Sequence, residues 1–155
     1  MTPFPQGNWL SSIRLYFAIS AILHLIWETL QLPLYTIWNT GSLGEIAFAV
    51  LHCTIGDMMI ASLSLLIALL VIGNRSWPSE RFTSVMMATI IIGIAYTVYS
   101  EWVNTAVRKT WQYSNLMPTL PVLGTGLSPF IQWLIVPSIA FSALRFRHKR
   151  QLGHR

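Results

Sequence analysis

The sequence predicts an all-α integral membrane protein, built as an antiparallel bundle of four transmembrane helices. Of the 155 residues, 54% are hydrophobic and only 10% are charged, whereas a soluble domain carries roughly a quarter charged residues. The hydrophobic residues also form four runs of about 20 residues or more, the length that a helix needs to cross a bilayer. We expect one domain, 1–155, with spans at 12–37, 45–72, 83–107 and 127–145.

The first run, 12–37, contains three polar residues in an otherwise apolar segment. His24 is followed four residues later by Glu28 and seven residues later by Gln31. At these offsets all three side chains lie on one face of an α-helix. A charge in the hydrocarbon region costs roughly 3 kcal/mol or more unless it is paired or hydrated, so Glu28 is a candidate functional residue. The structural alternative is a His24–Glu28 hydrogen bond that holds the bundle together.

The second run, 45–72, opens with a glutamate and carries two more ionisable residues inside the apolar segment. Glu45 stands where a negative charge interacts favourably with the helix dipole, and we interpret it as a helix-start residue. His52 and Asp57 follow it further along the run. Because Asp57 brings a second carboxyl group into hydrocarbon, it joins Glu28 as a candidate functional residue.

The third run, 83–107, ends in the polar and aromatic sequence YTVYSEWVNTAVR. Its polar side chains recur at offsets of 0, 4, 7 and 11, the spacing of one helical stripe. Aromatic residues between them are typical of a membrane–water interface. We interpret Arg108 as an interface anchor, with neutralisation of Glu101 across two turns as the alternative. The stripe consists of Thr97, Glu101, Asn104 and Arg108.

The fourth run, 127–145, follows the longest connection in the chain, 108–126. Prolines and glycines in that connection predict an ordered loop rather than a helix. The run carries Gln132 and Trp133 in its first two turns and leads into a basic tail, 145–155, which holds five of the ten basic residues. We interpret the tail as an anchor at the membrane surface and expect no nucleic-acid partner.

The positions of the basic residues predict the orientation. In an antiparallel bundle of four helices, both termini and the middle connection lie on one side of the membrane. Eight of the ten basic residues fall on that side, so the positive-inside rule places both termini in the cytoplasm. We expect a bacterial inner membrane or an equivalent membrane. The eight residues are Arg14, Arg75, Arg81, Arg145, Arg147, Lys149, Arg150 and Arg155.

In this orientation the ionisable residues of the spans fall in the middle and outer half of the membrane. The simplest explanation is one shared cavity that opens toward the outer side and is covered by the 108–126 loop. The candidate catalytic residues are His24, Glu28, Asp57 and Glu101. The candidate ligand-binding residues are Trp27, Gln31, His52, Tyr99, Trp102, Asn104, Gln132 and Trp133.

Three kinds of function fit these residues. A membrane enzyme without a cofactor would use Glu28 or Asp57 as a general acid, His24 as a proton relay, and aromatic rings to stabilise a cationic intermediate. A metal or haem protein would use His24, Glu28 and His52 as ligands, although the sequence has no HExxH or CxxCH motif. A subunit of a larger membrane complex, or a small transporter, would use the polar residues to bind a ligand or relay protons without catalysis. The partners that the sequence allows are a second copy of the chain or a larger membrane complex.

The residues also resemble a known family. HLIWE in the first run, IGD in the second, YSEW in the third and IQWLIVP in the fourth are similar to segments of the EXPERA family, the four-helix sterol Δ8–Δ7 isomerases and their relatives. The resemblance implies an intramembrane cavity in which a double bond shifts by protonation and deprotonation through a carbocation. It also implies that His24 and Glu28 match the H-x-x-x-E pair of the first helix, Asp57 the acid of the second, and Gln132 with Trp133 the polar–tryptophan feature of the fourth.

The chain departs from this family at three points. Its first loop is shorter, Gln132 stands where the isomerases usually have asparagine, and His52 is additional. A sterol substrate is therefore not implied. The sequence predicts a membrane lipid or a lipophilic small molecule, with an isoprenoid as the leading class, and acid–base isomerisation as the leading reaction.

Overall fold

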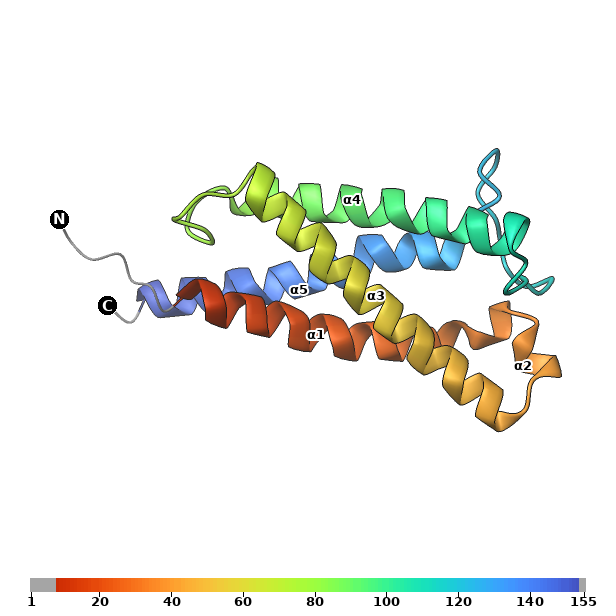
Figure 1. Cartoon of the computed structure of the whole chain (residues 1–155). Helices are drawn as coiled ribbons and strands as arrows, with labels where there is room; N and C mark the ends of the chain where they lie inside the picture. The colour runs from red at the N-terminus through yellow and green to blue at the C-terminus, as the bar shows by residue number, and fades with distance from the viewer. Residues whose placement is uncertain (1–7, 154–155) are drawn as a thin grey trace.

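The computed structural model describes residues 8–153 and is a bundle of four long helices (Figure 1). They are α1 (Asn8–Gln31), α3 (Leu43–Val71), α4 (Phe82–Trp102) and α5 (Leu127–Gly153), and residues 8–153 contain no β-strand. All four are long and apolar enough to cross a membrane, over Trp9–Leu34, Leu43–Val71, Phe82–Val107 and Leu127–Arg150. The predicted fold class, an all-α four-helix membrane bundle, is confirmed.

The turn between the first two spans follows from its local sequence. Pro33 lacks a backbone N–H and cannot continue a helix, so α1 gives way to a 3-10 turn (Leu32–Leu34) and then to the short helix α2 (Ile37–Thr40). A capping box starts α3. The Ser42 hydroxyl accepts a bond from the Glu45 backbone N–H, and the Glu45 carboxylate accepts one from the Ser42 N–H at 2.8 Å. This confirms the interpretation of Glu45 as a helix-start residue.

One half of the bundle is a close-packed apolar core. In this half, which we call the core end, α1 and α4 begin and α3 and α5 end. The rings of Tyr16 and Phe141 are fully buried with their centroids 5.1 Å apart. Small residues at the other helix contacts allow close approach of the backbones. The cluster also includes Ala61, Leu65, Ala68, Trp77, Val85, Trp133, Ala140 and Leu144.

The opposite half, which we call the cavity end, is more open. Figure 1 shows α3 crossing the bundle obliquely, so that its last turns lie beside α4 and its first turns lie near α2. Halfway along, Gly93 of α4 lies directly against the indole ring of Trp133 on α5, and a Cβ atom at Gly93 would overlap that ring. This contact holds α4 to α5 while α3 diverges from α4.

The 108–126 loop covers the cavity end and is ordered by backbone hydrogen bonds. The Thr36 N–H donates to the Gln112 carbonyl at 3.0 Å, and the Ser114 N–H donates to the Leu34 carbonyl at 2.9 Å. A second pair of segments meets at an isolated bridge between Thr119 and Gly126. The loop contains no helix, in agreement with its proline and glycine content, and it is attached to the chain that follows α1.

Candidate functional site

At the cavity end, three polar side chains from two helices surround the amide nitrogen of a glutamine on a third helix. The amide Nε2 of Gln132, on α5, lies 2.7 Å from Asp57 Oδ2 on α3 and 3.1 Å from Glu28 Oε1 on α1. It also lies 2.9 Å from the Nδ1 atom of His24 on α1. We call His24, Glu28, Asp57 and Gln132 the polar cluster. The sequence predicted each of them as a site residue, but it did not show that Gln132 joins the other three.

The polar cluster contains more acceptors than one amide group can serve. An amide nitrogen carries two hydrogens, whereas three acceptors surround the nitrogen of Gln132. The Nδ1 atom of His24 also lies 3.3 Å from Asp57 Oδ2. An N–H at Nδ1 of His24 can donate to Asp57 Oδ2, which leaves the two amide hydrogens for the two carboxyl groups. The four side chains therefore form one connected hydrogen-bond network.

The polar cluster is largely shielded from solvent. His24 and Gln132 are almost completely buried, and Glu28 is only 8% exposed. The second ring nitrogen of His24, Nε2, has no hydrogen-bond partner among the described residues, and the imidazole packs against the Trp133 ring with the centroids 5.4 Å apart. Electrostatic interactions in such a site are stronger than in water, because little solvent screens them.

A chain of hydrogen bonds positions Glu28 from behind. Gln31 donates from Nε2 to Glu28 Oε1 at 2.7 Å, and the Ser128 hydroxyl donates to Gln31 Oε1 at 2.8 Å. The indole N–H of Trp27 donates to the Ser128 hydroxyl at 3.1 Å. Trp27 and Gln31, predicted as ligand-binding residues, thus orient the Glu28 carboxyl group. Ser128 is a member that sequence reasoning missed, because an isolated serine at a helix start gives no distinguishing signal.

A second buried carboxyl group lies across the cavity on α4. Glu101 is 7% exposed and accepts a hydrogen bond from the Tyr113 hydroxyl, which in turn accepts one from the Gly126 N–H at 2.9 Å. Burial, with Glu101 nearby, raises the pKa of Tyr113 above its usual value, so this phenol keeps its proton and remains a donor. Tyr113 connects both ends of the loop to α4. No pattern in the sequence distinguishes Tyr113 from the other aromatic residues.

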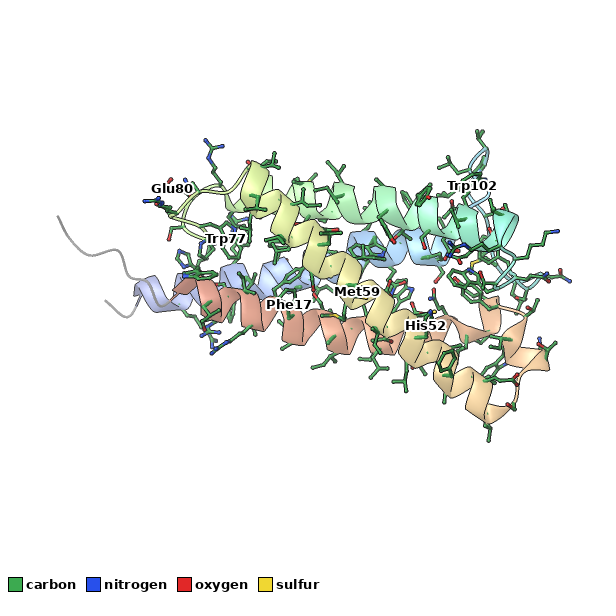
Figure 2. All side chains as sticks on the ribbon, in the orientation of Figure 1. Phe17, His52, Met59, Trp77, Glu80 and Trp102 are labelled. Atoms are coloured by element: carbon green, nitrogen blue, oxygen red, sulfur yellow. The ribbon has the colours of Figure 1, made fainter. Side chains whose placement is uncertain are left out.

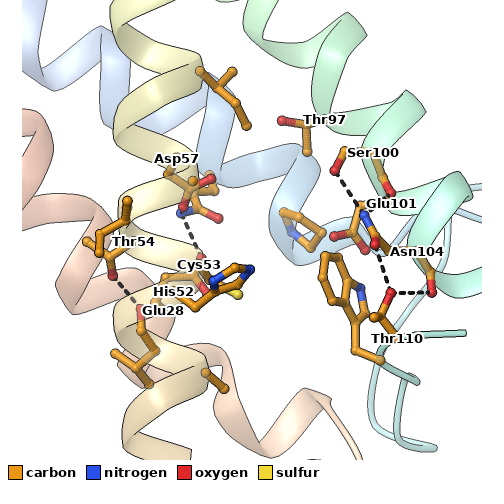
Figure 3. A pocket seen from close by; sticks show the side chains of 18 of the residues that line it. Glu28, His52, Cys53, Thr54, Asp57, Thr97, Ser100, Glu101, Asn104 and Thr110 are labelled. Carbon is orange, nitrogen blue, oxygen red and sulfur yellow. Dashed lines mark hydrogen bonds between the residues drawn. The ribbon is translucent and has the colours of Figure 1, made fainter. Parts of the chain in front are cut away.

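A cavity of about 1640 Å³ separates the two groups of carboxyl side chains. Glu28, Asp57 and Gln132 line one side, and Glu101 lines the other; Figure 3 shows Glu28 and Asp57 facing Glu101 across it. His24 does not line the cavity. The sequence predicts one cavity shared by the ionisable residues, and Glu28, Asp57 and Glu101 line one cavity in the structure.

The cavity also extends sideways between α3 and α4. Its lining includes Ile55, Met59 and Leu63 on α3, whose side chains are more than half exposed on the outside of the bundle. From α4 it includes Ile92 and Tyr96. In a membrane this apolar opening faces lipid tails. The sequence predicted an opening only toward the outer side, because helix patterns do not reveal how far two helices diverge.

The remaining predicted ligand-binding residues take different places. Asn104 lines the cavity, and so does His52, which is exposed and stacks on the ring of Phe48 at 5.5 Å. Tyr99 and Trp102 are more than half exposed and lie outside the lining, whereas Trp133 is fully buried against Gly93 and His24. Figure 2 shows His52 and Trp102 at the cavity end, away from Trp77 at the core end.

The expected polar stripe on α4 is interrupted by a π-helical turn, Val103–Val107. A π-helix has more residues per turn than an α-helix. The spacing of the predicted stripe, which assumes a regular α-helix, therefore does not hold beyond Trp102. Glu101 pairs with Tyr113, and the described residues show no ion pair between Glu101 and Arg108. Arg108 is exposed and lines the cavity.

The alternative of a metal or haem site finds no support in the arrangement of possible ligands. Within residues 8–153, no three His, Cys, Asp or Glu side chains are grouped so that they could hold a metal ion. His24 is buried in the polar cluster, whereas His52 is exposed on α3 and stacks on Phe48. The two histidines therefore belong to different environments.

No protein-family model, curated protein or solved structure matches this chain. The chemistry of the site therefore rests on the arrangement of its own residues.

Proposed function

We propose that this chain is an intramembrane enzyme that binds a lipophilic molecule, with an isoprenoid as the leading class, and shifts a double bond in it by acid–base catalysis. One observation carries the proposal. A buried, hydrogen-bonded polar cluster, His24, Glu28, Asp57 and Gln132, borders a large cavity that opens between two helices toward lipid.

The cavity favours a lipophilic ligand on physical grounds. Ligand sites are mostly apolar with a few placed polar groups, and this cavity combines apolar side chains of α3 and α4 with carboxyl groups at its inner wall. A molecule dissolved in the membrane could enter between α3 and α4 without passing through water. A water-soluble ligand would gain little from the exposed Ile55, Met59 and Leu63.

The two carboxyl groups of the cluster support proton transfer. The proposed reaction uses one of the two, Glu28 or Asp57, as the acid and the other as the base. The protonated group gives its proton to one alkene carbon, which leaves a positive charge on the neighbouring carbon. A carboxylate then removes a proton from the next carbon, and the double bond has moved by one position. One proton is added to the ligand and one is removed, so the reaction needs no oxidant or reductant.

The other polar side chains would assist this reaction. His24, which contacts the Asp57 and Gln132 side chains, can redistribute the proton after each turnover. Glu101 on the opposite side of the cavity can stabilise positive charge that develops on the ligand. The resemblance to the EXPERA family points to the same reaction, and the counts of basic residues support cytoplasmic termini in a bacterial inner membrane or an equivalent membrane.

Deuterium incorporation tests the proposal without knowledge of the product. The protein would be reconstituted in vesicles in D2O with farnesol or geranylgeraniol, and the recovered lipid analysed by mass spectrometry. Reversible protonation places solvent deuterium on carbon, and we expect wild-type protein to incorporate it. Glu28→Gln keeps the size and hydrogen bonds of the side chain but cannot give up an acid proton, so incorporation should fall by roughly 100-fold or more.

The matched control is Gln112→Glu, which adds a carboxyl group to a loop residue that lines the cavity. This variant should not compensate for Glu28→Gln, because it lies outside the polar cluster. Helical circular dichroism and elution from a sizing column would show that each variant is folded. Undiminished incorporation by folded Glu28→Gln would rule out Glu28 as the proton donor.

A further inference from the structure

Two cations lie beside the cavity, and the proposed reaction does not use them. Arg108 and Lys109 follow the π-helical turn at the end of the third span; both are exposed, and both line the cavity. We call them the cation pair. The described residues show no ion pair with either one. Their charges are therefore free to interact with a ligand.

The positions of the charged residues along the chain make the cation pair unusual. Among the residues that the structure describes, seven basic residues lie at the core end and two, Arg108 and Lys109, lie at the cavity end; the seven are Arg14, Arg75, Arg81, Arg145, Arg147, Lys149 and Arg150. A membrane protein gains no orientation signal from cations on its less basic side. A structural explanation is that cations near a helix C-terminus interact favourably with its dipole. That explanation accounts for their stability but not for their place on the cavity lining.

The acidic residues near the cavity opening are already engaged. Glu45 lines the cavity from α3, and its carboxylate accepts hydrogen bonds from the Ser42 N–H at 2.8 Å and the Ser42 hydroxyl at 2.7 Å. Glu101 accepts its bond from Tyr113. The cation pair therefore remains available to an anion, whereas Asn104 and Thr110 in the same lining are hydrogen-bonded to each other at 2.8 Å.

The cavity thus has a cationic end and an apolar side. From the cation pair its lining continues along α3 and α4 to lipid-facing residues such as Met59 and Leu63, with Asp57 between. A neutral isoprenoid would use only the apolar side. A molecule with an anionic headgroup and an unsaturated tail would use both, because its headgroup could meet the cations while its tail lies beside the polar cluster.

We propose that the ligand is a lipid with an anionic headgroup, a phosphate or a carboxylate, held by Arg108 and Lys109 with its tail along α3 and α4. This inference rests on the proposed function, since it names the ligand class of the same cavity. It goes beyond that proposal, because acid–base isomerisation alone does not require a charged ligand.

Native mass spectrometry of the detergent-solubilised protein tests this inference with farnesyl phosphate and farnesol, which share one tail. We expect wild-type protein to bind farnesyl phosphate at least tenfold more tightly than farnesol. A basic residue near a charged lipid surface is worth about 1 kcal/mol, or about fivefold in affinity. The double variant Arg108→Gln/Lys109→Gln should thus lose about 25-fold for farnesyl phosphate and little for farnesol.

The matched control is Arg75→Gln/Arg81→Gln, which removes two exposed cations at the core end. It should keep the wild-type preference. Inorganic phosphate at millimolar concentration provides another arm: it should not displace farnesyl phosphate, because the tail contributes most of the affinity. Equal binding of both ligands by wild-type protein, or a preference that survives in Arg108→Gln/Lys109→Gln, would overturn the inference. Displacement by inorganic phosphate would identify a site for free anions instead.

The failure of this inference and that of the proposed function give different results. Glu28→Gln should bind farnesyl phosphate as wild-type protein does, because Glu28 belongs to the polar cluster and not to the cation pair. If wild-type protein exchanges deuterium into farnesol but does not prefer farnesyl phosphate, only the anionic headgroup is wrong. If it prefers farnesyl phosphate but incorporates no deuterium into either ligand, the proposed reaction is wrong.

Discussion

The core end and the cavity end use the same four helices in opposite ways. At the core end, Tyr16 and Phe141 are fully buried among small and aliphatic residues. At the cavity end, α3 diverges from α4, and the buried side chains include His24, Glu28 and Glu101. A close-packed end can carry the stability of a bundle, and this leaves the other end free to keep costly buried polar groups and an open cavity.

Glycine residues mark the difference between the two ends. Gly93, on α4, has no room for a Cβ atom because the Trp133 ring fills the space beside it. Gly56, on α3, lines the cavity and has no atom within 4 Å of the place where its Cβ would lie. The first glycine permits close packing, whereas the second borders empty space. Mutations at the two ends should therefore act on different properties.

The largest effect on stability is expected from Phe141→Ala at the core end. Removing a fully buried aromatic ring should lower the free energy of unfolding by about 3–5 kcal/mol, because the surrounding side chains cannot fill the space. Denaturant unfolding in mixed micelles would measure it. The matched control, Phe48→Ala, removes an exposed ring at the cavity and should change stability by only about 0.5 kcal/mol. Similar losses for both variants would remove the distinction between the two ends.

A smaller effect is expected from Gln132→Leu in the polar cluster. The change leaves Glu28, Asp57 and His24 without their common donor, at a cost of about 1–3 kcal/mol in unfolding free energy. Deuterium incorporation into the ligand should fall with it. Gln112→Leu, in the exposed part of the cavity lining, is the control and should leave both properties near wild type. A stable, fully active Gln132→Leu would show that the amide does not organise the cluster.

The smallest effect is expected from Tyr113→Phe in the loop. Loss of the hydroxyl removes the bonds to Glu101 and Gly126 and should cost about 0.5–1.5 kcal/mol. Hydrogen exchange over 108–126 should become faster, whereas exchange at the core end should not change. Tyr96→Phe is the control, since Tyr96 is half exposed on α4. Unchanged exchange in the loop of Tyr113→Phe would show that other contacts hold it.

Because the pKa of Tyr113 is raised, the stability that its hydroxyl gives to the 108–126 loop depends on pH. A phenol whose pKa is higher in the folded than in the unfolded protein contributes stability that is fully present below about pH 10, the unfolded value. The contribution is lost as pH rises through the folded value. Loop protection in wild-type protein should therefore be constant from pH 6 to pH 9, apart from the intrinsic rate of exchange.

The fold could be predicted from the sequence because it depends on local properties. Four apolar runs of sufficient length and Glu45 at the start of the second are read directly from the chain. The contact of Gln132 with Glu28 and Asp57 could be suspected only because all three are expected at a similar depth in the membrane. Helical offsets relate residues within one helix and do not show which faces of two helices meet.

Other parts of the site had no signal in the sequence. Tyr113 acts through a loop whose path depends on backbone bonds to Leu34 and Thr36. The exposure of Tyr99 and Trp102 depends on which face α4 turns toward α5, and that is set by the contact between Gly93 and Trp133. Such features follow from packing between helices, which one sequence pattern does not determine.

Photo-crosslinking tests most directly the claim that the ligand occupies the cavity end. A farnesol analogue with a diazirine on its tail would be irradiated with the protein in vesicles, and the labelled peptides mapped by mass spectrometry. We predict labels within 44–67 and 92–112, which line the cavity, and competition by excess farnesol. Labels spread evenly over all four helices, or unaffected by farnesol, would contradict a specific cavity site and with it the proposed function.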